Sequence, residues 1–187
     1  KQYASKKQLG KPVLFIPTAG NVEDYRGYID EALQTFADLG FQVEILDISA
    51  CDRETAQAKI FQSKLLYVSG GNTFYLLQEL KKKQLLSLIK EQIADGMVYV
   101  GESAGAIITA KDIDYNKLMD DKSVAEELSN TEGLNEVDFY VLPHLGEEPF
   151  VESAQATLDT YSDQLNLFPL NNHQAVLVEG EEVKVLE

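Results

Sequence analysis

The sequence predicts an α/β fold in which a mostly parallel, doubly wound sheet lies between two layers of helices. Short apolar runs alternate with segments of helical periodicity along most of the chain, and this alternation is typical of parallel sheets. Two helical segments end in a glycine just before or at a strand-like run, Gly40 and Gly96, where a left-handed C-cap fits. Because 187 residues suit one compact domain, we expect residues 1–187 to form a single α/β domain.

The N-terminal half supplies three strands and two helices. Residues 12–18 (PVLFIPT) form a nearly continuous apolar run, as expected of a strand buried on both faces of a sheet. Asn21 is expected to cap a helix whose apolar residues recur at helical spacing until Gly40 ends it. The elements expected next are a strand at residues 41–48, a weaker helix at 53–62 and a strand at 64–69.

The C-terminal half continues the alternation and ends in a hairpin. Residues 73–94 predict a helical stretch with a break near Lys83, and residues 97–100 (MVYV) predict the next strand. Residues 112–135 are polar and acidic, so we expect them to cross the surface with one short helix near residues 123–129. The last expected elements are a strand at 137–142 and a hairpin of 175–178 with 183–186 around Gly180.

Composition narrows the functional classes. The chain has 31 acidic and 16 basic residues, a formal charge of −15, and it has no basic patch, which disfavours nucleic acid and anionic membrane surfaces as partners. One cysteine and two histidines leave no internal disulfide and too few ligands for a typical zinc site, so we expect no metal or organic cofactor. The sparse cysteine and the absence of a long apolar run predict a cytoplasmic protein.

Residues 101–105 (GESAG) follow a strand-like run and precede an apolar helix start. This setting suits a nucleophile elbow, in which a sharp turn between strand and helix exposes Ser103 and small neighbours avoid clashes. The amide of Ala104 would point toward the oxyanion of a tetrahedral intermediate. A structural turn with a hydrogen-bonded serine is the alternative. Glu102, inside the turn, could tune the local field, bind a substrate amine, or simply be an acid at a helix N-terminus.

Residues 69–73 (SGGNT) end the preceding predicted strand in the same way. Carboxyl ends of neighbouring parallel strands face one crevice, so this glycine turn and Ser103 can share a site, with the Gly71 amide as a second oxyanion donor. His144 follows the strand predicted at 137–142. It is favoured over His173 as the general base that a serine needs near neutral pH.

The motifs at residues 69–74 (SGGNTF), 101–105 (GESAG) and 142–144 (LPH) resemble, in order and spacing, the serine dipeptidase family of peptidase E and cyanophycinase. The resemblance spans residue 12 to the C-terminal hairpin. It implies a flavodoxin-like sheet related to class I glutamine amidotransferases, a Ser103 nucleophile, a His144 base and an oxyanion hole from the Gly71 and Ala104 amides. Family members carry a short strand ahead of the one at residue 12, so we expect a segment before Lys1.

The acid that would orient His144 is less defined, because the family places an aspartate just before a methionine, whereas Met119 follows Leu118 and precedes Asp120. Asp120 is the first candidate for this third position and Asp114 the next, with a Ser-His dyad or a water-linked acid as further alternatives. Recognition of an aspartyl side chain favours an arginine. The two arginines, Arg26 and Arg53, are remote in sequence from Ser103, which argues against strict Asp-X specificity.

These observations predict a serine-type peptidase, dipeptidase-like and exopeptidic, that hydrolyses short peptides through an acyl-enzyme on Ser103. The expected partner is a short peptide substrate, and a homodimer is left open. One alternative is a binding or regulatory homologue that has lost efficient chemistry. Another is an amidase or esterase with the same machinery.

Overall fold

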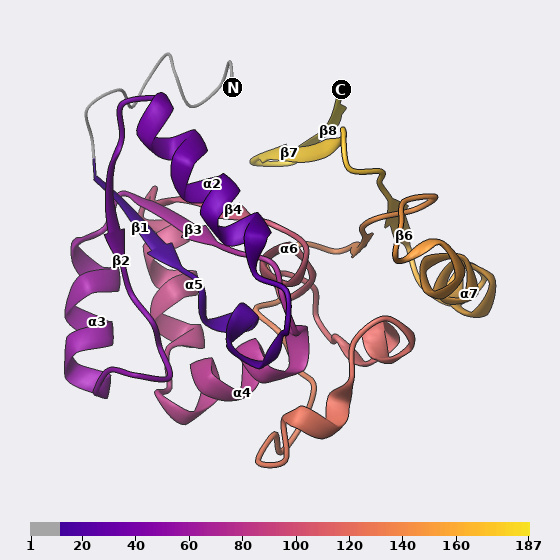
Figure 1. Ribbon diagram of the computed structural model, residues 1–187, viewed down its shortest axis with the longest axis horizontal. Coiled ribbons are helices and arrows are strands. Elements are labelled where there is room, and N and C mark those ends of the chain that lie inside the picture. Colours follow the sequence, from indigo (N-terminus) through magenta and orange to yellow (C-terminus); the bar gives the residue numbers. More distant parts are fainter. Residues whose placement is uncertain (1–11) are drawn as a thin grey trace.

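The computed structural model describes residues 12–187, so the segment expected before Lys1 lies outside it (Figure 1). Its centre is a parallel sheet of four strands in the order β2-β1-β3-β4. The four strands are β1 (Pro12–Ile16), β2 (Gln42–Ile45), β3 (Leu65–Val68) and β4 (Val98–Gly101). Each lies within or next to a run in which a strand was expected, and the parallel α/β fold class is confirmed.

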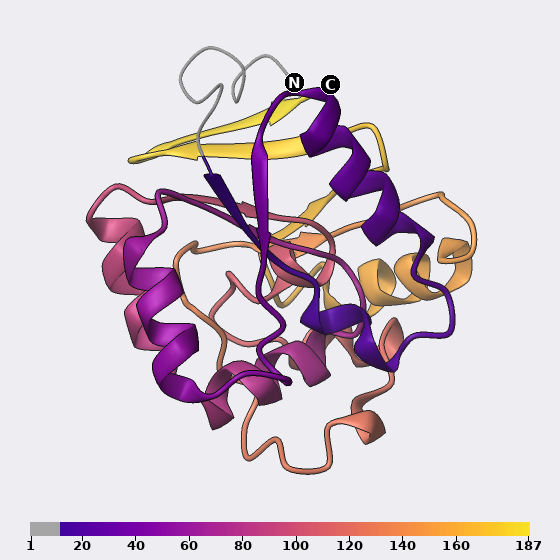
Figure 2. The same cartoon turned by 60° about the vertical axis from the view of Figure 1, so that its left-hand side comes forward.

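Helices cover both faces of this sheet (Figure 2). On one face, Val13 and Phe15 of β1 pack under α2 (Gly27–Asp38). On the other face, Leu14 and Ile16 pack against three helices. These are α3 (Arg53–Gln62), α4 (Thr73–Lys82) and α5 (Leu86–Ala94). Successive side chains of a strand point to opposite faces, so the continuous apolar run of β1 reflects burial on both sides.

The C-terminal part contains a second parallel pair that sequence periodicity did not predict. Strand β5 (Tyr140–Leu142) pairs with β6 (Leu167–Pro169), and helix α7 (Val151–Tyr161) lies between them in the chain. Helix α7 buries only Ala154 and Thr157 among its residues, and β6 has three residues, so neither gives a strong local pattern. The expected terminal hairpin is present as β7 (Ala175–Glu179) and β8 (Glu182–Leu186).

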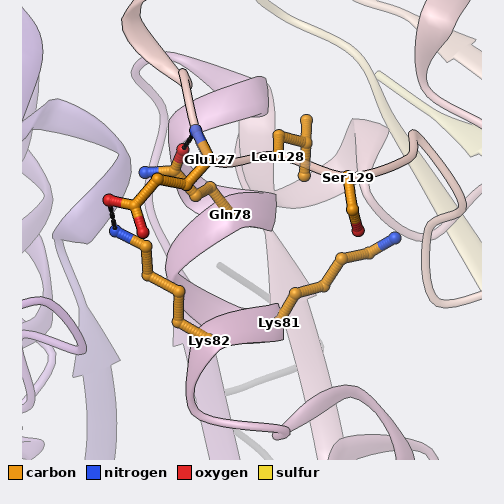
Figure 3. A pocket seen from close by; sticks show the side chains of 6 residues that line it. All are labelled: Gln78, Lys81, Lys82, Glu127, Leu128 and Ser129. Atoms are coloured by element: carbon orange, nitrogen blue, oxygen red, sulfur yellow. Dashed lines mark hydrogen bonds and ion pairs between the residues drawn. The ribbon is translucent and has the colours of Figure 1, made fainter.

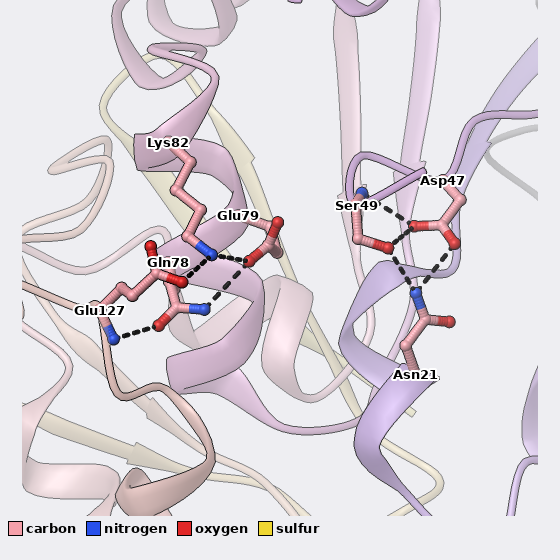
Figure 4. Close-up of polar contacts among 7 residues, drawn as sticks. All are labelled: Asn21, Asp47, Ser49, Gln78, Glu79, Lys82 and Glu127. Carbon is pink, nitrogen blue, oxygen red and sulfur yellow. Dashed lines mark hydrogen bonds and ion pairs between the residues drawn. The ribbon is translucent and has the colours of Figure 1, made fainter. Parts of the chain in front are cut away.

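Two expectations about the connecting segments were wrong. Asn21 does not cap a helix: it lies in a 3-10 turn, η1 (Thr18–Val22), and its amide donates to Asp47 Oδ2 and Ser49 Oγ at 2.9 and 3.0 Å (Figure 4). Residues 112–135 do not only cross the surface. They form two short 3-10 helices, η2 (Asp114–Leu118) and η3 (Lys122–Val124), and bury apolar side chains such as Ile113. The break expected near Lys83 is present, with Gln84 at φ 55°.

The segment 112–135 is fastened to helix α4 by polar contacts (Figures 3 and 4). The buried Gln78 accepts a hydrogen bond from the Glu127 amide at 2.8 Å and donates to Glu79 at 3.0 Å. Lys82 forms ion pairs with Glu79 and Glu127 at 3.1 and 2.8 Å. These contacts hold the part of the segment around Glu127 against α4. No helix within residues 12–187 is long and apolar enough to cross a membrane.

Candidate active site

Ser103 occupies a sharp turn between β4 and α6 (Ala104–Ile107), with φ 45° and ψ −106°. A non-glycine residue at positive φ is strained, and such strain collects at functional turns. Glycines make the turn feasible: a Cβ on Gly101 would lie 2.3 Å from the Gly105 carbonyl oxygen, and one on Gly105 would lie 2.2 Å from that of Val68. The elbow predicted from the sequence is therefore present in shape, although α6 is only a single turn long.

His144 meets Ser103 from the end of another strand. It lies two residues beyond β5, again at positive φ (61°), and its Nε2 is 3.0 Å from Ser103 Oγ. The ring of Phe150 stacks on the imidazole with centroids 4.7 Å apart and an interplanar angle of 20°. Two side chains that are 41 residues apart in sequence are thus within hydrogen-bond distance, with the imidazole plane held by an aromatic neighbour.

Asn172 occupies the position behind His144. Its Oδ1 is 2.6 Å from His144 Nδ1. An amide oxygen only accepts, so Nδ1 carries the hydrogen in this arrangement and Nε2 presents its lone pair to the Ser103 hydroxyl. Asn172 follows β6, and the Leu145 amide donates to the Leu170 carbonyl at 2.9 Å, which keeps the segments after β5 and β6 together.

Sequence reasoning missed Asn172 because it did not predict β6. The only available signal was the polar run at residues 171–174 after an apolar stretch.

The third position was assigned to Asp120, and this was wrong. Asp120 Oδ2 accepts from the Thr73 amide at 2.7 Å and from Asn116 Nδ2 at 2.8 Å, whereas the Nδ1 atom of His144 contacts Asn172. Asp120 follows η2, and its carboxylate satisfies the first backbone amide of α4. Burial raises the pKa of Asp120, against the lowering effects of these hydrogen bonds and of His144 nearby.

Asp114, the next candidate, is paired elsewhere. Its carboxylate forms ion pairs with Lys117 and Lys122 at 2.7 and 2.8 Å, and these hydrogen bonds lower its pKa.

The glycine turn after β3 lies against the elbow. A Cβ placed on Gly70 would be 3.4 Å from the Cβ of Ser103, which brings the two predicted motifs into one site. Gly71 has φ 127°, and a Cβ there would lie 2.3 Å from the carbonyl carbon of Ala19, so only glycine fits. Among the hydrogen bonds of residues 12–187, the amides of Gly71 and Ala104 have no acceptor. Free amides beside a serine are what an oxyanion hole requires.

Charged groups surround this turn, and one of them was not expected there. Arg26 Nε lies 3.7 Å, and Tyr28 Oη 2.9 Å, from the position that a Cβ on Gly20 would take. The Tyr28 ring is also 3.7 Å from the Cβ position of Gly70, so Arg26 shares the neighbour Tyr28 with the glycine turn beside Ser103. Burial raises the pKa of Tyr28 to about 12, and the carboxylates of Glu23 and Glu102 add to this rise. Acidic groups therefore outnumber the single arginine.

Within residues 12–187, no group of three or more His, Cys, Asp or Glu side chains has the arrangement needed to hold a metal ion. The prediction that no cofactor is required remains a prediction.

Comparison with known proteins places this site in a family. The chain matches the sequence pattern described as Peptidase family S51 over residues 2–186. It belongs to peptidase family S51. It is 47% identical to an uncharacterised peptidase of Pasteurella multocida over 171 residues, covering 91% of this chain and 83% of that one.

Further similarities agree with this membership of family S51. The chain is 31% identical to Peptidase E of a Nostoc species over 134 residues, which cover 72% of this chain and 52% of that one. A crystal structure from Listeria monocytogenes EGD-e, provisionally described as a peptidase E, superposes with a TM-score of 0.92 at 41% identity, covering 97% of this chain and 88% of that one. As a member of family S51, the protein is a serine peptidase.

Proposed function

We propose that this S51 member hydrolyses short peptides, as a dipeptidase-like exopeptidase, through an acyl-enzyme on Ser103. The observation that carries the proposal is the 3.0 Å contact between Ser103 Oγ, just after β4 of the central sheet, and His144 Nε2, just after β5 of the second parallel pair. The names of the relatives support a peptidase. A cytoplasmic location is part of the same proposal and rests on the cysteine content.

In the proposed reaction, the Ser103 oxygen attacks the carbonyl carbon while His144 Nε2 takes the hydroxyl proton. The negative oxygen of the tetrahedral intermediate accepts hydrogen bonds from the Gly71 and Ala104 amides. The carbon–nitrogen bond then breaks, and His144 gives its proton to the leaving amine. Water attacks the resulting ester with His144 again as base, which releases the acid product and restores the serine.

Asn172 replaces an acid in this scheme. Its Oδ1 keeps the hydrogen of His144 on Nδ1, so Nε2 remains the atom that faces the serine. A neutral acceptor stabilises an imidazolium less than a carboxylate does. We therefore assign to Asn172 the orientation of the ring and the choice of tautomer, with a smaller electrostatic contribution than in a Ser-His-Asp triad.

The test is hydrolysis of a panel of dipeptides and of an uncharged acyl ester by wild-type protein and by Ser103→Ala. We expect the variant to lose at least about a thousandfold in kcat/KM on every substrate that the wild type accepts. Activity that survives the substitution would contradict the assignment. A folded wild type with no activity on any substrate would favour a binding or regulatory homologue, and activity on amides or esters alone would favour the amidase or esterase.

A further inference from the structure

Glu102 lies inside the elbow, directly before Ser103, yet its side chain does not cap the helix that follows. Its Oε2 accepts a hydrogen bond from Tyr67 Oη at 2.7 Å and one from the Gly70 amide at 3.3 Å. Both donors belong to the neighbouring strand β3 and its glycine turn. The Glu102 carboxylate of the elbow therefore holds the backbone of the glycine turn that follows β3.

Tyr67 is a rigid anchor for this carboxylate. It is only 8% exposed, and its ring stacks on Phe15 at 4.8 Å and meets Phe36 edge-on at 5.0 Å between centroids. A buried phenol generally has a partner for its hydroxyl group, and here that partner is Glu102. The Glu102 side chain is thus held in place by Tyr67, whose ring is packed in the core under α2.

The Gly71 amide is bracketed by two hydrogen bonds from its neighbours. On one side the Gly70 amide donates to Glu102, and on the other the Asn72 amide donates to the Ala19 carbonyl at 2.9 Å. Gly71 itself packs so tightly on Ala19 that no side chain fits. The peptide units on both sides of the free amide are therefore fixed, one of them by Glu102.

We propose that Glu102 is a positioning residue that fixes the Gly71 amide of the oxyanion hole relative to Ser103. The inference rests on the proposed function, because it assumes an oxyanion at this site. Its physical content is preorganisation: a donor that is already aimed at the developing charge costs no rearrangement during the reaction. Since Glu102 is adjacent to Ser103 in the chain, its hydrogen bond to Gly70 fixes the position of the Gly71 amide relative to the Ser103 nucleophile.

The chemistry of the two hydrogen bonds predicts which variants retain this role. A glutamine oxygen can accept from both Tyr67 and Gly70, whereas alanine accepts from neither. If Glu102 instead acted by binding a substrate amine, its charge would be essential and glutamine would not replace it. The loss would then appear only with substrates that carry an amino group.

The experiment compares wild type, Glu102→Gln, Glu102→Ala and the control Glu31→Ala, an exposed acid on α2, on an acyl ester without an amino group and on a free dipeptide. We expect Glu102→Ala to lower kcat on both substrates about 10- to 100-fold with KM within about threefold, because a misdirected donor loses transition-state stabilisation. Glu102→Gln should recover most of this loss. Tyr67→Phe, which keeps the buried ring, should show a smaller loss of kcat.

Unchanged kcat in Glu102→Ala, or equal losses in the alanine and glutamine variants confined to the dipeptide, would overturn the inference. An ester hydrolysis that Ser103→Ala leaves intact would overturn the proposed function and this inference with it. Ester hydrolysis that depends on Ser103 but not on Glu102 would overturn the inference alone.

Discussion

At the scale of single residues, His144 is held in one tautomer by a neutral acceptor. The short contact from its Nδ1 to Asn172 Oδ1 leaves Nε2 free for Ser103. An aspartate in this position of a serine protease contributes about 10⁴-fold, and an amide oxygen shares its geometric role without its charge. Asn172 is therefore expected to increase the catalytic rate, but by a smaller factor than such an aspartate.

We predict that Asn172→Ala lowers kcat/KM about 10- to 100-fold, because His144 loses its orienting acceptor. Asn172→Asp, which retains an acceptor and adds charge, should keep at least wild-type activity. Steady-state kinetics on a neutral dipeptide measure both, with His173→Ala as a control on the adjacent residue. Equal activity of wild type and Asn172→Ala would show that the contact has no catalytic role.

Asp120 supplies a second prediction, on stability. Burial raises its pKa, so the folded state binds its proton more tightly than the unfolded state does. The resulting stability is fully present below the ordinary aspartate pKa of about 4 and is lost as pH rises through the raised value. In the variant Asp120→Asn this position does not titrate, and the amide oxygen can still accept from Thr73 and Asn116.

We therefore expect the melting temperature of wild type, relative to Asp120→Asn, to fall as pH rises from about 4 to 7. Differential scanning calorimetry across this range measures the difference. A difference that is constant, or that moves in the opposite direction, would contradict the burial of this carboxylate.

At the scale of elements, segment 112–135 depends on α4 through contacts of unequal value. The Gln78 side chain is buried and satisfies the Glu127 amide, so losing it leaves a polar group without its partner. The ion pair between Lys82 and Glu127 is largely exposed, with the Glu127 side chain 71% accessible. Exposed ion pairs contribute little to the free energy of unfolding.

We predict that Gln78→Ala lowers the free energy of unfolding by about 1–3 kcal/mol, whereas Glu127→Ala lowers it by less than about 1 kcal/mol. The two variants disturb the same junction and are matched controls for each other. Urea denaturation followed by circular dichroism measures both. Equal losses, or a larger loss in Glu127→Ala, would contradict the prediction that the buried amide contributes more than the exposed ion pair.

The elements also show where sequence reasoning succeeds. Strand β1 was predicted because a strand that is buried on both faces consists of a continuous apolar run. The elbow was predicted because close backbone contacts allow only glycine at Gly101 and Gly105, and these glycines are visible in the sequence. Strand β6 has no such local pattern. It forms because it pairs with β5, from which it is separated in the chain by helix α7. Local periodicity does not report such a long-range contact, so both β6 and Asn172, which follows it, were missed.

At the scale of the whole molecule, two separate parallel sheets bring distant motifs together at the carboxyl ends of their strands. The segments after β3, β4, β5 and β6 supply Gly71, Ser103, His144 and Asn172. Arg26 lies beside Gly20 and Tyr28, next to the glycine turn, although it is remote from this turn in sequence. The argument against an acidic substrate therefore has a different basis in the structure: three carboxylates, those of Glu23, Glu102 and Asp120, and one arginine act on Tyr28 beside the glycine turn.

We predict that dipeptides with a neutral or basic first residue are hydrolysed with kcat/KM about tenfold or more above those beginning with aspartate, because like charges in close approach disfavour binding. The gap should narrow in high salt, which screens exposed charges. Competition assays with mixed dipeptides at two salt concentrations measure this ratio. An aspartyl dipeptide as the best substrate would contradict it and would point to Arg26 as its ligand.

The central claim is that His144 activates Ser103 as a nucleophile. The most direct measurement is the intact mass of the protein after incubation with a fluorophosphonate, followed by peptide mapping. The account predicts one adduct on Ser103, absent in Ser103→Ala and formed at least about 100-fold more slowly in His144→Ala. A wild-type protein that forms no adduct at Ser103, or labels equally well without His144, would contradict it.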